Sequence, residues 1–319
     1  MNLIYHPRML EHYVPDDCPE QPGRLEALLA VPWLSARIAS ALQGNYRDDQ
    51  ESVHRALNGE PYLKLFHTPR YIQQIKEESS HLGEREFTTI DQERETWLSA
   101  RSYEAACYAV GASVQAAELA RKGENSFALT RPPGHHAFPD KSHGFCLFNN
   151  VAIATEHLRR QGERVMIIDL DLHLGDGTLA YVESKEDVFY FSFHQEEEWP
   201  RTRFTSKSKG NTRLVYLPEG TTEDTYISVL REYLPADLRR FHPSLIAVSA
   251  GFDTYKTDQD QPLLRETMGG FMLTSQSTRE LINIINEGGK PYFAVLEGGY
   301  TAESVLAGVL SFVEIFSAL

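Results

Sequence analysis

The chain has 319 residues, a length that suits one large α/β domain or two small ones, and 41% of them are hydrophobic, enough for a sizeable core. Its 31 Lys and Arg against 45 Asp and Glu give a formal net charge of −14, which argues against binding nucleic acid through its phosphates. The three cysteines form no CxxC pair, and no apolar run approaches the ~20 residues that span a bilayer. We therefore expect a cytoplasmic protein with no membrane partner.

The predicted elements alternate between strands and helices after a first hundred residues that show no regular pattern. Several of the apolar runs lack polar alternation, which is typical of strands buried on both faces of a parallel sheet. The predicted fold is a single α/β domain over residues 1–319, with a central, mainly parallel β-sheet flanked by helices on both faces. We expect strands at 127–130, 165–170, 188–193, 244–249 and 292–296, and helices at 102–121, 149–160, 223–240, 267–287 and 301–317.

The first of these strands is followed by RPPGHH, which carries the adjacent residues His135 and His136. Ligands of open parallel sheets bind beyond the carboxyl ends of the strands. Adjacent histidines are most often unrelated surface residues, but here Asp169 and Asp176 could each orient one imidazole and tune its proton affinity. Two such pairs would supply the base and the acid that a metal-dependent hydrolase needs.

The next strand leads into the run VMIIDLDLHLGDGT at 165–178. In an extended strand Asp169, Asp171 and His173 point to the same face, and buried charges of this kind need partners. A polar strand end running into solvent is the ordinary alternative. However, AGFD brings Asp253 from another strand end, and two carboxylates with one imidazole are suitable zinc ligands that leave a position open for water.

The last strand ends in EGGY, which presents Tyr300 after two glycines. The tyrosine is either an ordinary half-buried residue or a phenol on a mobile loop, placed to stabilise the oxyanion of a reacting carbonyl.

Together these segments resemble the histone deacetylase and acetylpolyamine amidohydrolase superfamily, nearer its class II deacetylase branch. The resemblance implies an arginase-like fold with one zinc ion on Asp171, His173 and Asp253. It also implies catalytic roles for His135 and His136, backed by Asp169 and Asp176, and for Tyr300 in the transition state. The matching segments are RPPGHHA (131–137), GFCLFNN (144–150), DLDLHLGDGT (169–178), SAGFD (249–253) and EGGY (297–300).

The same resemblance implies further binding residues. Many relatives bind potassium, which here would use the side chains of Asp169 and Ser192 and the backbone carbonyls of Asp171, His173 and Phe193. The walls of an acyl-lysine tunnel correspond to Phe145 and Trp199, and the backbone of Gly144 would position the substrate amide. Leu263 aligns with the acidic gatekeeper of polyamine-specific relatives, so its side chain favours acyl-lysine.

Three positions depart from the family pattern. Leu174 replaces a second histidine that many relatives carry, Cys18 stands where relatives often have the histidine of an HPE motif, and residues 200–203 read PRTR rather than a glycine-rich turn. None of them removes the catalytic set, although the altered turn bears on the choice of substrate.

The predicted activity is zinc-dependent hydrolysis of an N-acyl-lysine amide in a protein or peptide, releasing acetate and a free amine. An acetylated polyamine is the alternative substrate. An arginase-like ureohydrolase with two manganese ions would need a second acidic pair, for which Asp258 is the candidate, and an inactive binding protein would be expected to lack part of the site. The acidic residues Asp258, Asp260 and 196–198 form either a solvated surface or a feature that attracts a cation. The sequence leaves oligomerisation open.

Overall fold

The computed structural model describes residues 1–45, 56–196, 199–200, 210–259 and 269–314. Within this part of the chain, seven parallel strands form one sheet in the order β1-β4-β9-β8-β5-β6-β7. The predicted parallel α/β sheet is confirmed. The strands are β1 (Asn2–Ile4), β4 (Ser126–Ala128), β5 (Val165–Asp169), β6 (Val188–Gln195), β7 (Thr212–Leu217), β8 (Leu245–Ala250) and β9 (Tyr292–Leu296). A short antiparallel pair, β2 (Thr88–Thr89) and β3 (Trp97–Leu98), lies apart from the sheet.

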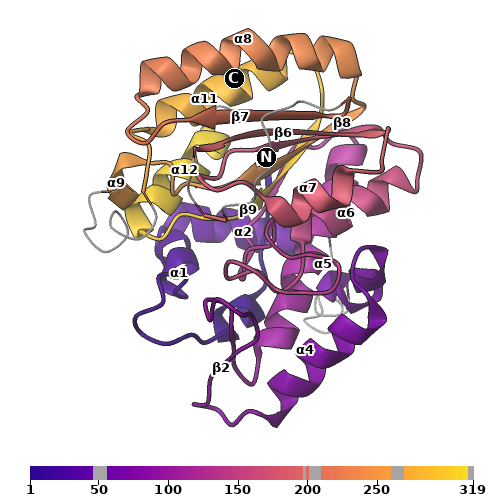
Figure 1. Ribbon diagram of the computed structural model, residues 1–319, viewed down its shortest axis with the longest axis vertical. Coiled ribbons are helices and arrows are strands. Elements are labelled where there is room, and N and C mark those ends of the chain that lie inside the picture. Colours follow the sequence, from indigo (N-terminus) through magenta and orange to yellow (C-terminus); the bar gives the residue numbers. More distant parts are fainter. Residues whose placement is uncertain (46–55, 197–198, 201–209, 260–268, 315–319) are drawn as a thin grey trace.

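Helices cover both faces of the sheet, as predicted. Figure 1 shows α8 and α11 on one side and α5 and α6 on the other. The α-helices are α1 (Gly23–Leu29), α2 (Pro32–Asn45), α4 (Pro69–His81), α5 (Ser102–Arg121), α6 (Asn150–Arg159), α7 (Asp176–Val182), α8 (Glu223–Phe241), α9 (Lys256–Gln259), α11 (Ser275–Glu287) and α12 (Ala302–Glu314), with 3₁₀ turns at Pro7–Glu11 and Glu60–Leu65. No helix in the described part of the chain is both long and apolar enough to cross a bilayer.

The helix expected at 267–287 begins later, at Ser275. The Thr274 hydroxyl accepts a hydrogen bond from the backbone N–H of Gln276, at 3.2 Å, and this cap fixes the start. Just before it, Met272 and Leu273 form isolated β-bridges with Thr222 and Tyr255. The apolar residues ahead of the helix are therefore in extended backbone, which periodicity alone did not distinguish from helix.

The strand order brings the polar strand ends together. Because β4, β9, β8 and β5 are consecutive neighbours and parallel, the segments that follow them meet at one edge of the sheet. These segments are RPPGHH, EGGY, AGFD and DLDLH. The fold thus places four of the predicted motifs side by side.

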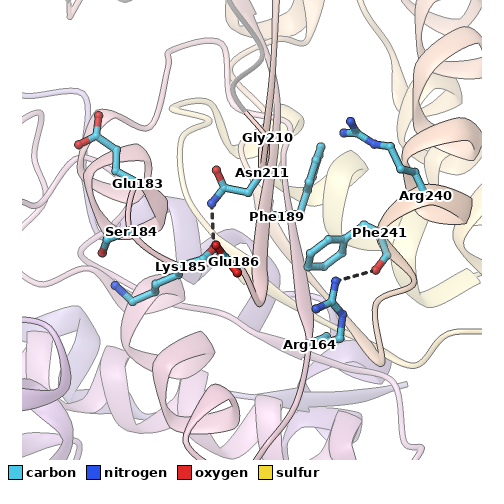
Figure 2. Close-up of a pocket in the computed structure, with 10 residues that line it drawn as sticks. All are labelled: Arg164, Glu183, Ser184, Lys185, Glu186, Phe189, Gly210, Asn211, Arg240 and Phe241. Atoms are coloured by element: carbon cyan, nitrogen blue, oxygen red, sulfur yellow. Dashed lines mark hydrogen bonds between the residues drawn. The ribbon is translucent and has the colours of Figure 1, made fainter.

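The opposite edge, where β5, β6 and β7 begin, contains a cavity of about 550 Å³ (Figure 2). Polar groups in its wall are bound within the fold: the Asn211 side-chain amide donates to the Lys185 carbonyl at 2.9 Å, and the Arg164 guanidinium donates to the Phe241 carbonyl at 3.0 Å. None of the predicted site residues lines this cavity. The functional site therefore lies at the other edge.

Candidate active site

Asp171, His173 and Asp253 form a compact, buried cluster at the carboxyl ends of β5 and β8. His173 Nδ1 lies 3.2 Å from Asp171 Oδ1 and 3.1 Å from Asp253 Oδ2. Gly251 and Gly298 permit this approach, because a Cβ atom at either position would collide with the Asp171 side chain. The three predicted zinc ligands are thus brought together.

The local backbone differs from the prediction. The strand β5 ends at Asp169, so the expectation that Asp169, Asp171 and His173 share one face of an extended strand is wrong. Instead, Asp169 Oδ1 accepts from the Asp171 N–H at 3.1 Å, and Asp171 Oδ1 accepts from the His173 N–H at 3.0 Å. These side-chain-to-backbone bonds compete with strand pairing and turn the chain. The turn directs Asp171 and His173 to Asp253, while Asp169 faces a different partner.

The chemistry of this cluster fits a divalent metal ion. Burial and the adjacent charge of Asp171 raise the pKa of Asp253, which reflects two carboxylates held close together without solvent. A bound cation would relieve that repulsion, and Asp and His are ordinary zinc ligands. Backbone donors hold both carboxylates in place: the Leu172 N–H donates to Asp253 Oδ1 at 3.0 Å and the Gly298 N–H to Asp171 Oδ2 at 2.8 Å.

His135 and His136 lie beside the cluster, each with its own carboxylate. His135 Nδ1 is 3.2 Å from Asp169 Oδ2, and His136 Nδ1 is 2.8 Å from Asp176 Oδ1. Burial opposes protonation of His135, but the charges of Asp171 and Asp169 outweigh it and hold its pKa well above the ordinary value. Burial and the neighbouring His135 lower the pKa of His136 to about 3, against the pull of Asp176. The two imidazoles are therefore electrostatically unequal.

A buried glutamate fixes the loop that carries both histidines. Glu297 Oε2 accepts from the Gly134 N–H at 2.6 Å and from the His135 N–H at 3.1 Å. Burial raises the pKa of Glu297 to about 7. On the other side of the loop, the Asn149 side-chain amide donates to the Ala137 carbonyl at 3.2 Å while its oxygen caps α6. The loop is thus held from both sides of the sheet edge.

Tyr300 lies at the edge of the cluster and is half-buried. Its backbone N–H donates to Asp258 Oδ2 at 2.7 Å, its ring packs edge-on against Phe145 with centroids 5.7 Å apart, and the Arg24 guanidinium lies 5.2 Å from the ring centroid. Gly298, two residues before Tyr300, permits a close approach, because a Cβ there would meet the carboxylates of Asp171 and Asp253. Tyr300 is therefore anchored rather than carried on a loosely held glycine loop.

Comparison with known proteins identifies the family of the chain. A family model described as the histone deacetylase domain matches residues 18–316. The chain belongs to the histone deacetylase family. It is 34% identical over 318 residues to a probable deacetylase of Archaeoglobus fulgidus, covering 95% of this chain and 82% of that protein.

Two solved structures share the fold. The HD domain of HDA15 superposes with a TM-score of 0.80 at 28% identity, covering 98% of this chain and 88% of that one. An acetylpolyamine aminohydrolase from Burkholderia pseudomallei superposes with a TM-score of 0.73 at 24% identity, covering 99% and 98% of the two chains, a similarity that shows the fold alone.

Two of the predicted substrate-binding residues of this deacetylase-family chain, Gly144 and Trp199, lie against His136, and a third, Phe145, lies against Tyr300. Gly144 has a left-handed φ of +47°, and a Cβ there would collide with the rings of Trp199 and His136. The Trp199 ring centroid lies 4.5 Å from that of His136 and 5.8 Å from that of His173. Phe145 and Trp199 are partly exposed above the buried cluster. Leu263 lies outside the described residues.

The structure also describes most of the predicted potassium ligands and of the positions that depart from the family pattern. Asp169 and Ser192 are register partners on β5 and β6, and the Ser192 hydroxyl lies 3.0 Å from His194 Nδ1. Phe193, Leu174 and Cys18 are buried apolar residues. Of the altered turn at 200–203, only Pro200 is among the described residues.

Sequence reasoning missed several residues that support the site. Glu297 begins the EGGY motif, so its position next to a predicted residue was a usable signal. Asp258, considered from the sequence as a second metal ligand or part of an acidic surface, is instead buried and accepts from the Tyr300 N–H. Tyr190, whose hydroxyl donates to Asp169 Oδ2 at 2.8 Å, lies within a continuous apolar strand and gave no such signal. His143 directly precedes Gly144 and contacts Asp176.

Proposed function

We propose that this deacetylase-family protein is a zinc-dependent hydrolase that cleaves the amide of N-acyl-lysine, with acetyl as the acyl group, in a protein or peptide. The observation that carries the proposal is the meeting of a buried Asp–His–Asp cluster with two separate His–Asp pairs at one edge of the sheet. This combination places two proton-transfer groups directly beside a metal site.

Asp171, His173 and Asp253 would hold one zinc ion. When bound, zinc supplies Lewis-acid polarisation of the scissile carbonyl and lowers the pKa of a bound water. The chain's part is to keep these three ligands fixed: the backbone N–H groups of Leu172 and Gly298 hold the two carboxylates, and the Asp171 carboxylate accepts from the His173 N–H.

The two histidines would move the protons. One imidazole of the pair His135 and His136 accepts a proton from the attacking water, and an imidazole returns a proton to the leaving amine nitrogen. Asp169 and Asp176 keep each ring in one orientation through its Nδ1 atom, so that its Nε2 atom faces the reaction. The products are a short carboxylate and a free amine.

Tyr300 and the aromatic residues around it would handle the substrate. The Tyr300 hydroxyl donates to the oxygen of the scissile carbonyl as negative charge develops on it. Trp199 beside His136 and Phe145 beside Tyr300, both partly exposed, would flank the acyl-lysine chain, and the backbone of Gly144 would position its amide. Potassium, if bound, would use Asp169, Ser192 and the carbonyls of Asp171, His173 and Phe193.

Two other functions are less well supported. A ureohydrolase with two metal ions would need Asp258 as a ligand at the cluster, but the oxygens of Asp258 are bound to Tyr300 and Thr301. An acetylated polyamine remains the nearest alternative, since the protein is acidic and Glu196 is exposed; Asp260, Glu197 and Glu198 lie outside the described residues.

A substrate panel tests the proposal directly. Acetyl-lysine peptides, longer acyl-lysine peptides, acetylated polyamines and arginine should be compared by kcat/KM with the zinc-loaded enzyme, using Asp253→Asn protein from the same preparation as the background. The acetyl-lysine peptides should give the highest kcat/KM. A higher value for the polyamines would reassign the substrate, and no cleavage of any amide above the Asp253→Asn background would overturn the proposed function.

A further inference from the structure

A third histidine, His143, lies against the second His–Asp pair. Its Nδ1 atom is 3.0 Å from Asp176 Oδ2, and its Nε2 atom is 3.1 Å from Glu93 Oε2. The His143 side chain is 8% exposed and Asp176 is 1% exposed, whereas Glu93 is 51% exposed. His143 thus stands between a buried carboxylate and the surface segment that joins β2 to β3.

Asp176 is shared between two imidazoles. Its Oδ1 atom accepts from His136 Nδ1 at 2.8 Å and from the Gly177 N–H at 3.0 Å. Its Oδ2 atom has no other partner among the described residues and lies 3.0 Å from His143 Nδ1. The contact therefore pairs opposite charges across a distance that an N–H donor at this position can also bridge. Without His143, a carboxylate oxygen would be buried and unpaired, which is costly and leaves the carboxylate free to turn.

Charge on His143 is supported by its surroundings. Burial and Lys141 oppose protonation, but the contacts with Asp176 and Glu93 outweigh them and raise the pKa of His143 above its ordinary value. The charge of Glu95 also interacts with His143.

The His143 ring has a separate contact. It lies against the Trp199 indole with centroids 4.4 Å apart and planes inclined by 34°. His136 meets the same indole edge-on, at 4.5 Å and 80°. The Trp199 ring thus contacts two imidazoles, which also meet each other edge-on with centroids 5.7 Å apart, and one of them belongs to the proposed proton-transfer pair.

We propose that His143 is a positioning residue with two separable actions: its Nδ1 atom fixes Asp176 and so orients His136, and its ring fixes Trp199 at the substrate side. This inference rests on the proposed function. In the proposed reaction, the first action is expected to affect kcat and the second is expected to affect substrate binding. Neither action requires His143 to touch the reacting atoms.

Two substitutions separate these actions. His143→Phe keeps a ring against Trp199 but removes the nitrogen that faces Asp176. His143→Asn removes the ring, and its side-chain amide places an N–H donor the same number of bonds from Cα as the His143 Nδ1 atom. Glu93→Gln is the matched control, since it removes a charge from the exposed side of His143, where ion pairs contribute little.

Steady-state kinetics on the zinc-loaded full chain tests the inference, with melting temperature and zinc content measured on every variant. His143→Phe should lower kcat ~10- to 100-fold, the usual cost of losing such a supporting contact, with KM within ~2-fold of the wild type. The kcat of His143→Asn should be at least ~5-fold higher than that of His143→Phe, and its KM should be several-fold higher than that of the wild type. Glu93→Gln should change neither kcat nor KM by more than ~2-fold.

The two ways of failing are distinguishable. Wild-type kcat in His143→Phe, or equal kcat in the Phe and Asn variants, would show that His143 only fills space and would overturn the inference. An absence of amide cleavage by the wild-type enzyme itself would instead overturn the proposed function.

Discussion

The Asp258 carboxylate offers a clean way to disturb Tyr300 without touching its phenol. Asp258 is buried; its Oδ2 atom accepts from the Tyr300 N–H at 2.7 Å, whereas its Oδ1 atom accepts from the Thr301 N–H at 3.0 Å and the Thr301 hydroxyl at 2.6 Å. In Asp258→Asn the amide oxygen is expected to stay with Thr301, because that orientation preserves two bonds. The amide NH₂ then faces the Tyr300 N–H, and one bond is lost.

Losing one hydrogen bond to a charged group costs about 1.5–3 kcal/mol of folding free energy. For a chain of this size we expect the melting temperature to fall by roughly 2–5 °C. Because Tyr300 is no longer anchored, kcat should fall by at least ~10-fold, as small misplacements of catalytic groups are costly. The assays are thermal unfolding and steady-state kinetics on acetyl-lysine peptide.

Thr301→Val is the matched control for this prediction. It removes the Thr301 hydroxyl from Asp258 and from Ser304 but leaves the Tyr300 N–H bond intact. It should therefore lose comparable stability while keeping kcat within ~2-fold. If both variants lose stability and kcat alike, or if Asp258→Asn keeps a normal kcat, Asp258 does not act through Tyr300 and the reasoning is refuted.

Three further substitutions test other parts of the site and the core. Tyr300→Phe should lower kcat ~100- to 1000-fold with little change in substrate affinity or zinc content, and an unchanged kcat would make the phenol merely structural. His135→Ala and His136→Ala should each lose at least ~100-fold in rate, and near-normal rates in both would remove them from the mechanism. Burial lowers the pKa of His67 to about 3, so as pH falls below ~6.5 the unfolded chain gains a proton that the native protein cannot bind, and the contribution of His67 to stability falls by about 2 kcal/mol at pH 5. His67→Gln should reduce the loss of stability between pH 6.5 and 5 by about that amount, while His194, whose burial also lowers its pKa to about 3, keeps its own share; an unchanged slope in thermal melts would refute the assignment to His67.

The central strands were predictable because they are continuous apolar runs. The edge strands β1 (Asn2–Ile4) and β7 (Thr212–Leu217) were not, since β1 has three residues and β7 is only partly buried, with no continuous apolar signal. The start of α11 was misplaced because the extended residues before it are as apolar as the helix itself.

The candidate site was predictable to the extent that its residues lie in short motifs next to strand ends. The sequence could not show how Asp169 and Asp171 divide their roles, because that depends on the turn after β5, where side chains bind backbone N–H groups. The roles of Glu297 and His143 depend on contacts with residues more than 30 positions away, and no spacing rule predicts those.

The most direct test of the account is the metal dependence of amide hydrolysis. Purified protein should contain about one zinc ion per chain, and zinc-stripped protein should keep its fold but lose cleavage of acetyl-lysine peptide. Activity should return in proportion to zinc added, up to one ion per chain, and Asp253→Asn should neither retain that zinc nor regain activity. Full turnover by protein shown by elemental analysis to be free of metal would contradict the central claim, because Asp171, His173 and Asp253 would then have no role in hydrolysis.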